Sequence, residues 1–243
     1  MRYKLEISYN GKDYHGFQYQ PDKLTIQEVL ENKLLVVVGT NISVVASGRT
    51  DAGVSAISQI CHFDCDKDID CNKIVGYINH LLPQDIRVIN INKAKNSFHA
   101  RYSAKKKTYE YLFYIGREIP VYDEVAVNIG YNLNINKMKD ACKHLIGTND
   151  FSCFCASNTE VKDKVRTIFD AKISKLNDNL YKFSVTGNGF LYNMVRIIMG
   201  TLVSVGMGKL QPEDICSIIK SLDRNNAGKT MPSKGLYLKK VVY

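Results

Sequence analysis

The chain of 243 residues lacks the patterns that mark several classes of protein. No uninterrupted apolar run reaches the ~18 residues that a membrane-spanning helix needs, so we expect no transmembrane segment. Residues 1–10 alternate like a strand and contain no apolar signal-peptide core, which predicts a cytoplasmic protein. Low-complexity segments that would indicate disorder are also missing, and an apolar content of 45% is ordinary for a globular protein.

Cysteine pairs and metal-binding motifs are missing as well. The seven cysteines show no CxxC spacing, which argues against a disulfide framework and against a zinc ribbon. The cluster of Cys61, His62, Cys65 and Cys71 falls on an expected strand and the acidic loop behind it, a poor arrangement for a metal. The four carboxylates of residues 64–70 lack the glycine and the terminal glutamate of an EF-hand, so we expect a solvated turn there. We therefore predict no metal.

Positive charge is what the sequence has in excess. The formal net charge is +9, of which residues 1–104 carry +1 and residues 105–243 carry +8. A basic surface favours encounter with a polyanion, because contacts with phosphates supply most of the sequence-independent affinity for nucleic acids. Charge by itself favours a nucleic-acid partner only slightly, since a basic surface that merely keeps the protein soluble has the same composition.

Hydrophobic periodicity predicts a mixture of strands and helices. Strands are expected at residues 2–8, 57–63, 86–94, 109–113, 165–176, 180–186 and 236–243. Helices are expected at residues 25–38, behind a capping box at Thr25, and at 72–82, 134–146, 190–205 and 212–222. Because hairpins replace strict βαβ alternation, the order predicts an α+β fold with mainly antiparallel sheets, built from two similar halves, residues 1–104 and 105–243.

The loop around Asp51 is built to display a carboxylate. Residues 46–56, Ala-Ser-Gly-Arg-Thr-Asp-Ala-Gly-Val-Ser-Ala, lie between two strand-like runs, and the glycines at 48 and 53 allow unusual backbone angles or close approach of a ligand. Arg49, two residues before Asp51, is placed to hold a phosphate. For an isolated Thr-Asp pair, an ordinary turn with a side-chain cap is the more common case.

A basic and aromatic stretch occupies residues 98–111. Positive charges that lead into an aromatic strand suit RNA, because the charges hold phosphates while a ring stacks on a base. The candidate RNA-binding cations are Arg101, Lys105, Lys106 and Lys107. On the strand itself, Tyr109, Tyr111 and Phe113 are expected to share one face. A tyrosine that fills the core with its hydroxyl satisfied is the alternative.

Arg196 is out of place among its neighbours. Residues 190–205 are apolar on almost every side, which predicts a buried helix. A guanidinium inside such a helix needs a carboxylate partner, because an unpaired buried charge costs several kcal/mol.

Four stretches resemble, in order along the chain, motifs of the TruA family of tRNA pseudouridine synthases. They are Gly-Arg-Thr-Asp-Ala-Gly-Val at 48–54, Phe-His-Ala-Arg-aromatic-Ser-Ala at 98–104, Asn-Gly-Phe-Leu-Tyr-x-Met-Val-Arg at 188–196, and Ala-Gly-x-Thr-x-Pro-x-x-Gly-Leu-Tyr-Leu at 227–238. A His-Gly pair before Phe17 resembles a further family segment, in which tryptophan is usual at that position. An aromatic residue there suits stacking on a base, and a packed loop is the alternative.

This resemblance implies a fold, a site and a reaction. The implied fold is the pseudouridine synthase fold, with helices flanking the sheets of two similar halves and the active cleft between them. Asp51 falls on the catalytic aspartate, Arg196 on the arginine that pairs with it, Tyr109 on the active-site tyrosine, and Leu236 on a residue of the uracil pocket. The implied protein is a homodimer that binds tRNA, and it needs no cofactor. It isomerises a flipped uridine to pseudouridine in the anticodon stem-loop, at roughly positions 38 to 40.

Two positions depart from the family pattern. Ser55 stands where histidine is usual, which argues against a general base there. Lys107 and Thr108 stand where arginines are usual, so lysine point charges would replace a bidentate grip on phosphate. The role of residues 151–166, which we expect to be a polar and partly disordered insertion, stays open. Two other functions also stay open, namely an RNA-binding protein without catalysis and a synthase with another RNA target.

Overall fold

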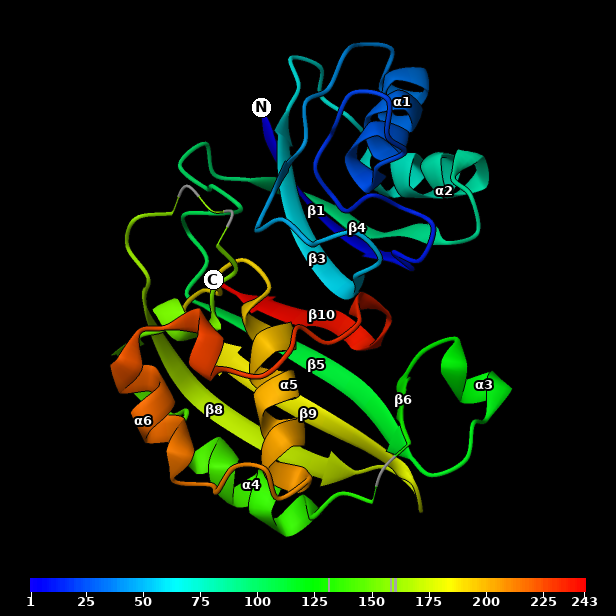
Figure 1. Cartoon of the computed structure of the whole chain (residues 1–243). Coiled ribbons are helices and arrows are strands. Elements are labelled where there is room, and N and C mark those ends of the chain that lie inside the picture. The colour runs from blue at the N-terminus through cyan, green and yellow to red at the C-terminus, as the bar shows by residue number, and fades with distance from the viewer. Residues whose placement is uncertain (131, 158, 160) are drawn as a thin grey trace. The chain divides into compact units, whose positions relative to one another are not determined.

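The structure is a computed structural model that describes residues 1–130, 132–157, 159 and 161–243. The chain forms two compact units (Figure 1). Unit 1 consists of residues 1–105 and 237–243, and unit 2 consists of residues 106–236. The expected halves, 1–104 and 105–243, differ from this division in the last strand, which joins unit 1. Among the described helices, none is both long and apolar enough to cross a membrane.

Unit 1 combines a mostly antiparallel sheet with two helices that lie side by side in Figure 1. Its strands are β1 (Arg2–Tyr9), β2 (Val45–Ala46), β3 (Ser55–Asp64), β4 (Ile86–Ala94) and β10 (Leu236–Val242). Their order is β4-β1-β3-β10, with β2 paired to β3. The helices are α1 (Ile26–Val38) and α2 (Cys71–Leu81). The last strand belongs to unit 1 because Tyr237 and Leu238 pair in parallel with Ser55 and Ala56.

Local signals set the ends of the helices in unit 1, as expected. The Thr25 side chain accepts a hydrogen bond from the amide of Glu28 and so caps the first turn of α1. Gly39 ends this helix in the left-handed conformation, with φ +73°. The acidic turn caps α2 through Asp70, whose side chain accepts from the amide of Lys73.

Unit 2 is built on strands that are mainly antiparallel. Its strands are β5 (Lys106–Ile115), β6 (Val127–Ile129), β7 (Gly147–Asp150), β8 (Val165–Lys175) and β9 (Leu180–Gly187). Their order is β5-β9-β8-β7, and β6 pairs in parallel with β5. The helices are α3 (Pro120–Asp123), α4 (Ile135–Lys143), α5 (Met194–Gly206) and α6 (Asp214–Ser221), with 3₁₀ turns η1 (Ser152–Phe154), η2 (Arg224–Asn226) and η3 (Ser233–Gly235). The predicted α+β class with mainly antiparallel sheets is confirmed.

Two expectations for unit 2 are corrected. The helix expected at 190–205 begins at Met194, because Asn193 adopts the left-handed conformation (φ +59°) and breaks the helical path. The insertion expected at 151–166 is not polar at its start: Phe151 and Phe154 are fully buried, as is Cys153 between them. Residues 158 and 160 of that insertion lie outside the described residues.

The strand of alternating aromatics is confirmed in β5. Tyr111 and Phe113 are fully buried and Tyr109 is 8% exposed, whereas Glu110 and Leu112 between them are half-buried. This alternation follows from the period of two in a strand, which sends successive side chains to opposite faces of the sheet. Tyr109 therefore points to the same face as the core of unit 2.

Candidate active site

The loop that carries Asp51 is held by a second loop of unit 1. The amide of Phe17 donates to the carbonyl of Thr50 at 3.1 Å, and the amide of Gly53 donates to the carbonyl of Tyr14 at 3.1 Å. These two bonds fix the chain on both sides of Asp51. The Asp51 side chain is half-exposed between them.

Close backbone packing adds to these bonds. A Cβ on Gly16 would lie 2.7 Å from the carbonyl oxygen of Thr50, and Gly16 has φ +95°, which favours glycine. The buried hydroxyl of Thr50 lies 2.8 Å from the hydroxyl of Tyr9 at the end of β1. The loop therefore presents Asp51 from a rigid support, and the neighbouring Arg49 is exposed.

The roles of Phe17 and Ser55 are structural in this support. Phe17 is 2% exposed and its ring lies 6.2 Å from that of Tyr9, so it packs in the loop and presents no face for a base. Ser55 is 6% exposed, and its hydroxyl accepts a hydrogen bond from the amide of Gly11 at 3.0 Å. This serine thus ties the start of β3 to the loop after β1.

Arg196 lies in the first turn of α5, and its guanidinium is oriented by two acceptors of unit 2. Its Nε donates to the carbonyl of Met231 at 2.6 Å, and its Nη1 donates to Oδ1 of Asn193 at 2.7 Å. The amide of Met231 donates back to the carbonyl of Arg196 at 3.2 Å. The side chain is half-exposed, so the apolar run does not bury this charge fully.

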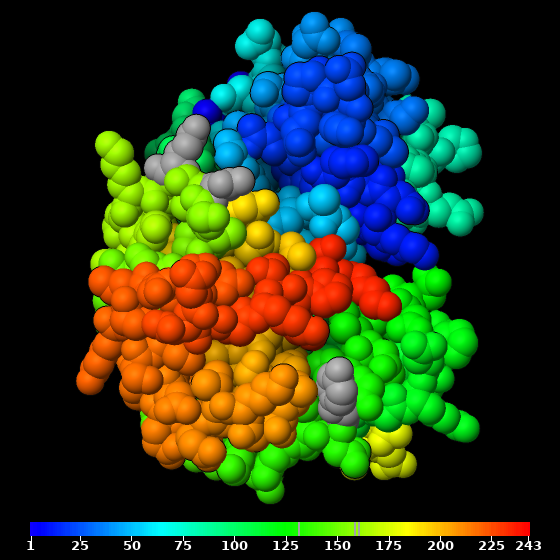
Figure 2. Space-filling view, viewed as in Figure 1, coloured from blue at the N-terminus to red at the C-terminus, as the bar shows by residue number. Residues whose placement is uncertain are grey.

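The segment that carries Met231 crosses α5 in backbone contact. A Cβ on Gly200 would overlap the carbonyl of Lys229, and a Cβ on Gly228 would overlap the backbone of Gly200. The amide of Gly228 donates to the Thr201 hydroxyl at 2.8 Å. Figure 2 shows this segment, orange to red, lying over α5 on the surface of unit 2. The two glycines thus set the distance at which Met231 meets Arg196.

Two tyrosines of β5 contact the same part of unit 2. Tyr109 packs its ring edge-on against Phe190, with 5.1 Å between the ring centroids. Tyr111 donates its hydroxyl hydrogen to the carbonyl of Pro232 at 2.7 Å, next to the carbonyl that Arg196 binds. Burial raises the pKa of Tyr111, and the nearby charge of Arg196 opposes this rise. Leu236, at the start of β10, is 5% exposed.

The candidate RNA-binding cations fall into two groups. In unit 1, Arg101 is exposed, with its guanidinium 5.6 Å from the ring centroid of Tyr102, and Lys105 is exposed as well. In unit 2, Lys106 is exposed and its ammonium lies 4.7 Å from the ring of Phe169, while Lys107 is half-exposed. Thr108, the departure from the family pattern, joins β5 to β9 through a 2.8 Å contact between its hydroxyl and that of Thr186.

Sequence reasoning did not single out two residues that position the candidate groups. Asn193 orients Arg196, and Phe190 packs on Tyr109. Both lie inside the motif at 188–196, which was the available signal. Their roles depend on a left-handed residue and on a contact with β5, and neither follows from local periodicity.

In the described part of the chain, no group of three or more His, Cys, Asp or Glu side chains is arranged to hold a metal ion. The predicted ion pair of Arg196 with Asp51 stays a prediction.

Comparison with known protein families shows to which family the chain belongs. The model of a family described as tRNA pseudouridine synthase matches residues 7–103 and 141–243. The chain therefore belongs to the tRNA pseudouridine synthases, a family of isomerases that act on tRNA. The matched segments contain Arg49, Asp51, Arg101, Arg196 and Leu236. The candidates at 105–109 lie between the two segments.

Two bacterial relatives agree with this family over the whole chain. A tRNA pseudouridine synthase A of Bacillus subtilis (strain 168) is 46% identical over 246 residues, which cover 100% of this chain and 99% of that protein. A tRNA pseudouridine synthase A of Thermoanaerobacter sp. (strain X514) is 42% identical over 240 residues, covering 98% of both chains. Among solved structures, an archaeal box H/ACA sRNP Nop10-Cbf5 complex aligns at 13% identity and a TM-score of 0.35, covering 80% of this chain and 45% of that chain.

Proposed function

We propose that Asp51 is the catalytic carboxylate of this synthase and that the target is a uridine of the tRNA anticodon stem-loop. The observation that carries the proposal is the way the loop holds Asp51. Its carboxylate is half-exposed, and backbone hydrogen bonds fix the chain on both sides of it, at Thr50 and at Gly53. A group held in this way needs little reorganisation when a substrate arrives. The motif around Asp51 also lies in the segment that matches the family.

The reaction is an isomerisation and needs no oxidant or reductant. The N1–C1′ glycosidic bond of uridine breaks, the uracil turns, a C5–C1′ bond forms, C5 loses its proton, and N1 gains one, so no atom is lost or added overall. Ionised Asp51 starts the reaction by attack on C1′, by attack on C6, or by removal of the C2′ proton. These three routes use the same carboxylate, so the assignment of Asp51 does not depend on the choice.

Two residues of unit 2 are proposed to complete the chemistry. Arg196 would keep Asp51 ionised, because a nearby cation favours the carboxylate form. Its bonds to Met231 and Asn193 support this role, since they fix the plane of the guanidinium. Tyr109 would stack on the uracil or remove the C5 proton after the new bond has formed. Leu236 would contribute an apolar contact to the base.

The remaining candidates are proposed to hold the RNA. Arg49 is exposed beside Asp51 and would bind a phosphate or fill the space of the flipped nucleotide. The other proposed phosphate contacts are Arg101, Lys105, Lys106 and Lys107. We further propose a homodimer that acts in the cytoplasm, where tRNA is available, and light scattering of the purified protein tests the dimer directly.

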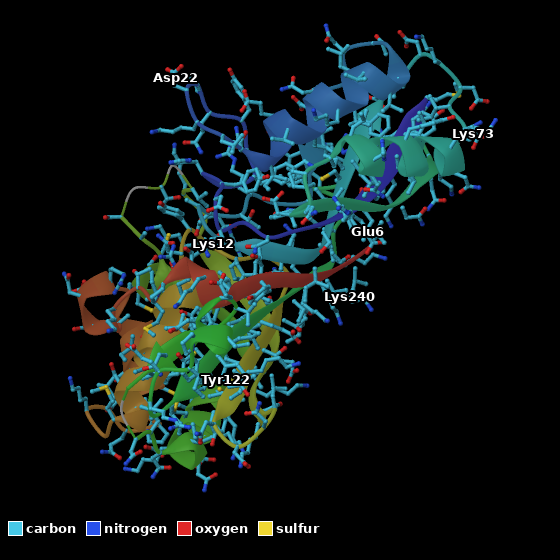
Figure 3. The ribbon with its side chains drawn as sticks, turned by 90° about the vertical axis from the view of Figure 1, so that its right-hand side faces the viewer. Glu6, Lys12, Asp22, Lys73, Tyr122 and Lys240 are labelled. Atoms are coloured by element: carbon cyan, nitrogen blue, oxygen red, sulfur yellow. The ribbon has the colours of Figure 1, made fainter. Side chains whose placement is uncertain are left out.

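The test measures tritium release from an anticodon-arm RNA that carries C5-tritiated uridine. Wild type is expected to release tritium, and Asp51→Asn is expected to release none while its affinity for the RNA stays within about threefold, because the amide keeps the size of the carboxylate but cannot act as nucleophile or base. Asp22→Asn is the matched control, because Asp22 is exposed at the tip of the loop before α1 (Figure 3) and asparagine tolerates its φ of +58°.

Three outcomes separate the alternatives. Equal release by wild type and Asp51→Asn contradicts the assignment of Asp51. RNA binding without release from any uridine-containing tRNA favours an RNA-binding protein without catalysis. Release from full-length tRNA but not from the anticodon arm indicates a synthase with another target in the RNA.

A further inference from the structure

We propose that a basic and aromatic pocket of unit 1 binds a nucleotide of the tRNA outside the active site, an inference that rests on the proposed function. We call it the Lys4 pocket. Its volume is about 450 Å³, within the range of small-ligand sites. Its lining includes Lys4, Lys93, Lys95, Phe98, Ser103 and Tyr243. All of these residues belong to unit 1.

One wall of the Lys4 pocket combines a cation with two aromatic rings. The rings of Phe98 and Tyr243 lie 4.9 Å apart and are tilted by 56°. The ammonium of Lys4 lies 5.7 Å from the centroid of Phe98 and 4.9 Å from that of Tyr243, a cation–π arrangement. A nucleotide needs this combination, because its phosphate binds a cation and its base stacks on a ring.

The charge of the pocket is concentrated on two lysines. The ammonium of Lys93 lies 2.7 Å from the carboxylate of Asp68, which neutralises much of its charge. Lys95 is exposed on the turn after β4, and Lys4 reaches the pocket from β1. A phosphate in the pocket therefore meets Lys4 and Lys95, and Ser103 adds a hydroxyl to the lining.

Arg2 fixes the turn that carries Lys95 and Phe98. Its Nε and Nη2 bind the carboxylate of Asp64 at 2.8 and 2.7 Å, and its Nη1 donates to the carbonyls of Asn96 and Phe98 at 2.9 and 2.8 Å. The hydrogen bond from Arg2 lowers the pKa of Asp64, so this pair stays charged at neutral pH. The turn is therefore ordered before a ligand binds, which reduces the entropy lost on binding.

The position of the pocket suits a long RNA substrate. Lys4 lies near the start of β1, whereas Tyr9 at the end of β1 contacts Thr50 of the Asp51 loop. Five residues of a strand at about 3.3 Å each separate the two ends by roughly 16 Å. An RNA arm is longer than this distance, so one tRNA can reach the pocket and the Asp51 loop together.

The test compares two variants that each remove one positive charge from unit 1. Lys4→Met keeps the length and the apolar stem of the side chain. Lys73→Met is the matched control, because the Lys73 side chain is 75% exposed on α2 (Figure 3), and α2 packs on the face of the sheet opposite to Lys4. Affinity for full-length tRNA is measured by fluorescence anisotropy at several salt concentrations.

We expect Lys4→Met to weaken tRNA binding about tenfold at low salt and to reduce the slope of log K against log salt by about one, as for the loss of one phosphate contact. Lys73→Met is expected to change the affinity less than about twofold. Equal affinities and slopes for the two variants would overturn the proposal. If Lys4→Met melts at a lower temperature than wild type, Lys95→Met on the exposed turn replaces it, with the same expected result.

Two further measurements complete the test. The first asks whether the pocket binds RNA or a free nucleotide, and the second asks whether the proposed function itself holds. Uridine monophosphate is titrated into both variants, and binding to Lys73→Met but not to Lys4→Met, with equal tRNA affinities, would overturn the assignment to RNA. Tritium release by wild type is measured on the same tRNA. Its absence contradicts the proposed function, whereas the comparison of affinities still decides whether the pocket binds RNA.

Discussion

The Asp51 loop of unit 1 and the Arg196 helix of unit 2 hold their candidate groups in different ways. Asp51 stands on a loop whose backbone bonds to another loop, through Thr50 and Gly53. Arg196 stands on a helix, and its own side chain makes the bonds that orient it, to Met231 and Asn193. The backbone bonds of unit 1 thus fix the position of Asp51, and the side-chain bonds of unit 2 fix the orientation of the Arg196 guanidinium.

This difference follows from the reach of the two side chains. An aspartate has a short side chain, so fixing its backbone largely fixes its carboxylate. An arginine has a long and flexible side chain, and its guanidinium has a defined place only when its N–H groups are bonded. Both supports share one device, the close approach of two backbones at a glycine: Gly16 in unit 1, and Gly200 with Gly228 in unit 2.

The largest effect is expected at the crossing in unit 2. In Gly200→Ala the new Cβ would overlap the carbonyl of Lys229, so the segment before Met231 must move away from α5. We expect a loss of about 3 kcal/mol in the free energy of unfolding, near the upper end for overpacking. Urea unfolding measures it. Gly76→Ala in α2, where a Cβ meets nothing within 4 Å, is the control and should gain roughly 0.5–1 kcal/mol. Similar changes in the free energy of unfolding for the two variants would contradict the close backbone contact between Gly200 and Lys229.

A smaller loss of stability is expected in the support of Asp51. Gly16→Ala places a Cβ 2.7 Å from the carbonyl of Thr50 and strains a residue with φ +95°. We expect a loss of about 2 kcal/mol in the free energy of unfolding, together with a lower rate of tritium release, because the loop must shift. Gly208→Ala, at φ +74° with open space around it, separates strain from contact. If both variants lose the same amount, strain alone explains the result and the loop contact adds nothing.

An effect on activity rather than stability is expected at Asn193. Asn193→Gly keeps the left-handed backbone and removes the Oδ1 that accepts from Arg196. The guanidinium then keeps its bond to the Met231 carbonyl but loses the bond to Asn193. We therefore expect kcat to fall about tenfold, which corresponds to about 1.4 kcal/mol of barrier. Asn193→Asp retains an acceptor and should keep more of the activity. An unchanged kcat in Asn193→Gly would show that the helix itself, and not the side-chain bond, orients Arg196.

The smallest effect is a pH dependence that we expect from His62 in unit 1. Burial lowers the pKa of His62, whose Nδ1 accepts from the amide of Ala100 and therefore needs the neutral ring. Below the unfolded value of about 6.5, the unfolded chain binds a proton that the folded chain resists, so stability falls as the pH drops. We expect a decrease of about 2 °C in Tm between about pH 7 and pH 5.5. His62→Gln, which retains an acceptor, should flatten this part of the profile, and an equally steep profile would contradict the assignment.

Much of the fold was predictable because its signals are local. Thr25, Gly39 and Asp70 mark helix ends through contacts with residues three or four positions away, and the alternation in β5 follows from the period of a strand. The family was predictable from motifs that contain Asp51 and Arg196. The buried start of residues 151–166 was not predictable. The segment is polar as a whole, and its two phenylalanines, Phe151 and Phe154, are buried only through their packing in the core of unit 2.

The sequence by itself determined the chemistry that each motif carries and the secondary structure around it, because caps, turns and periodicity act over a few residues. The tertiary structure decided which segments meet. It joined β10 to β3 through Tyr237 and Ser55, placed the Met231 carbonyl on Arg196, and brought Lys4, Phe98 and Tyr243 into one pocket. These contacts join residues far apart in the chain. They form only when the sheets and helices are packed, and no local pattern encodes them.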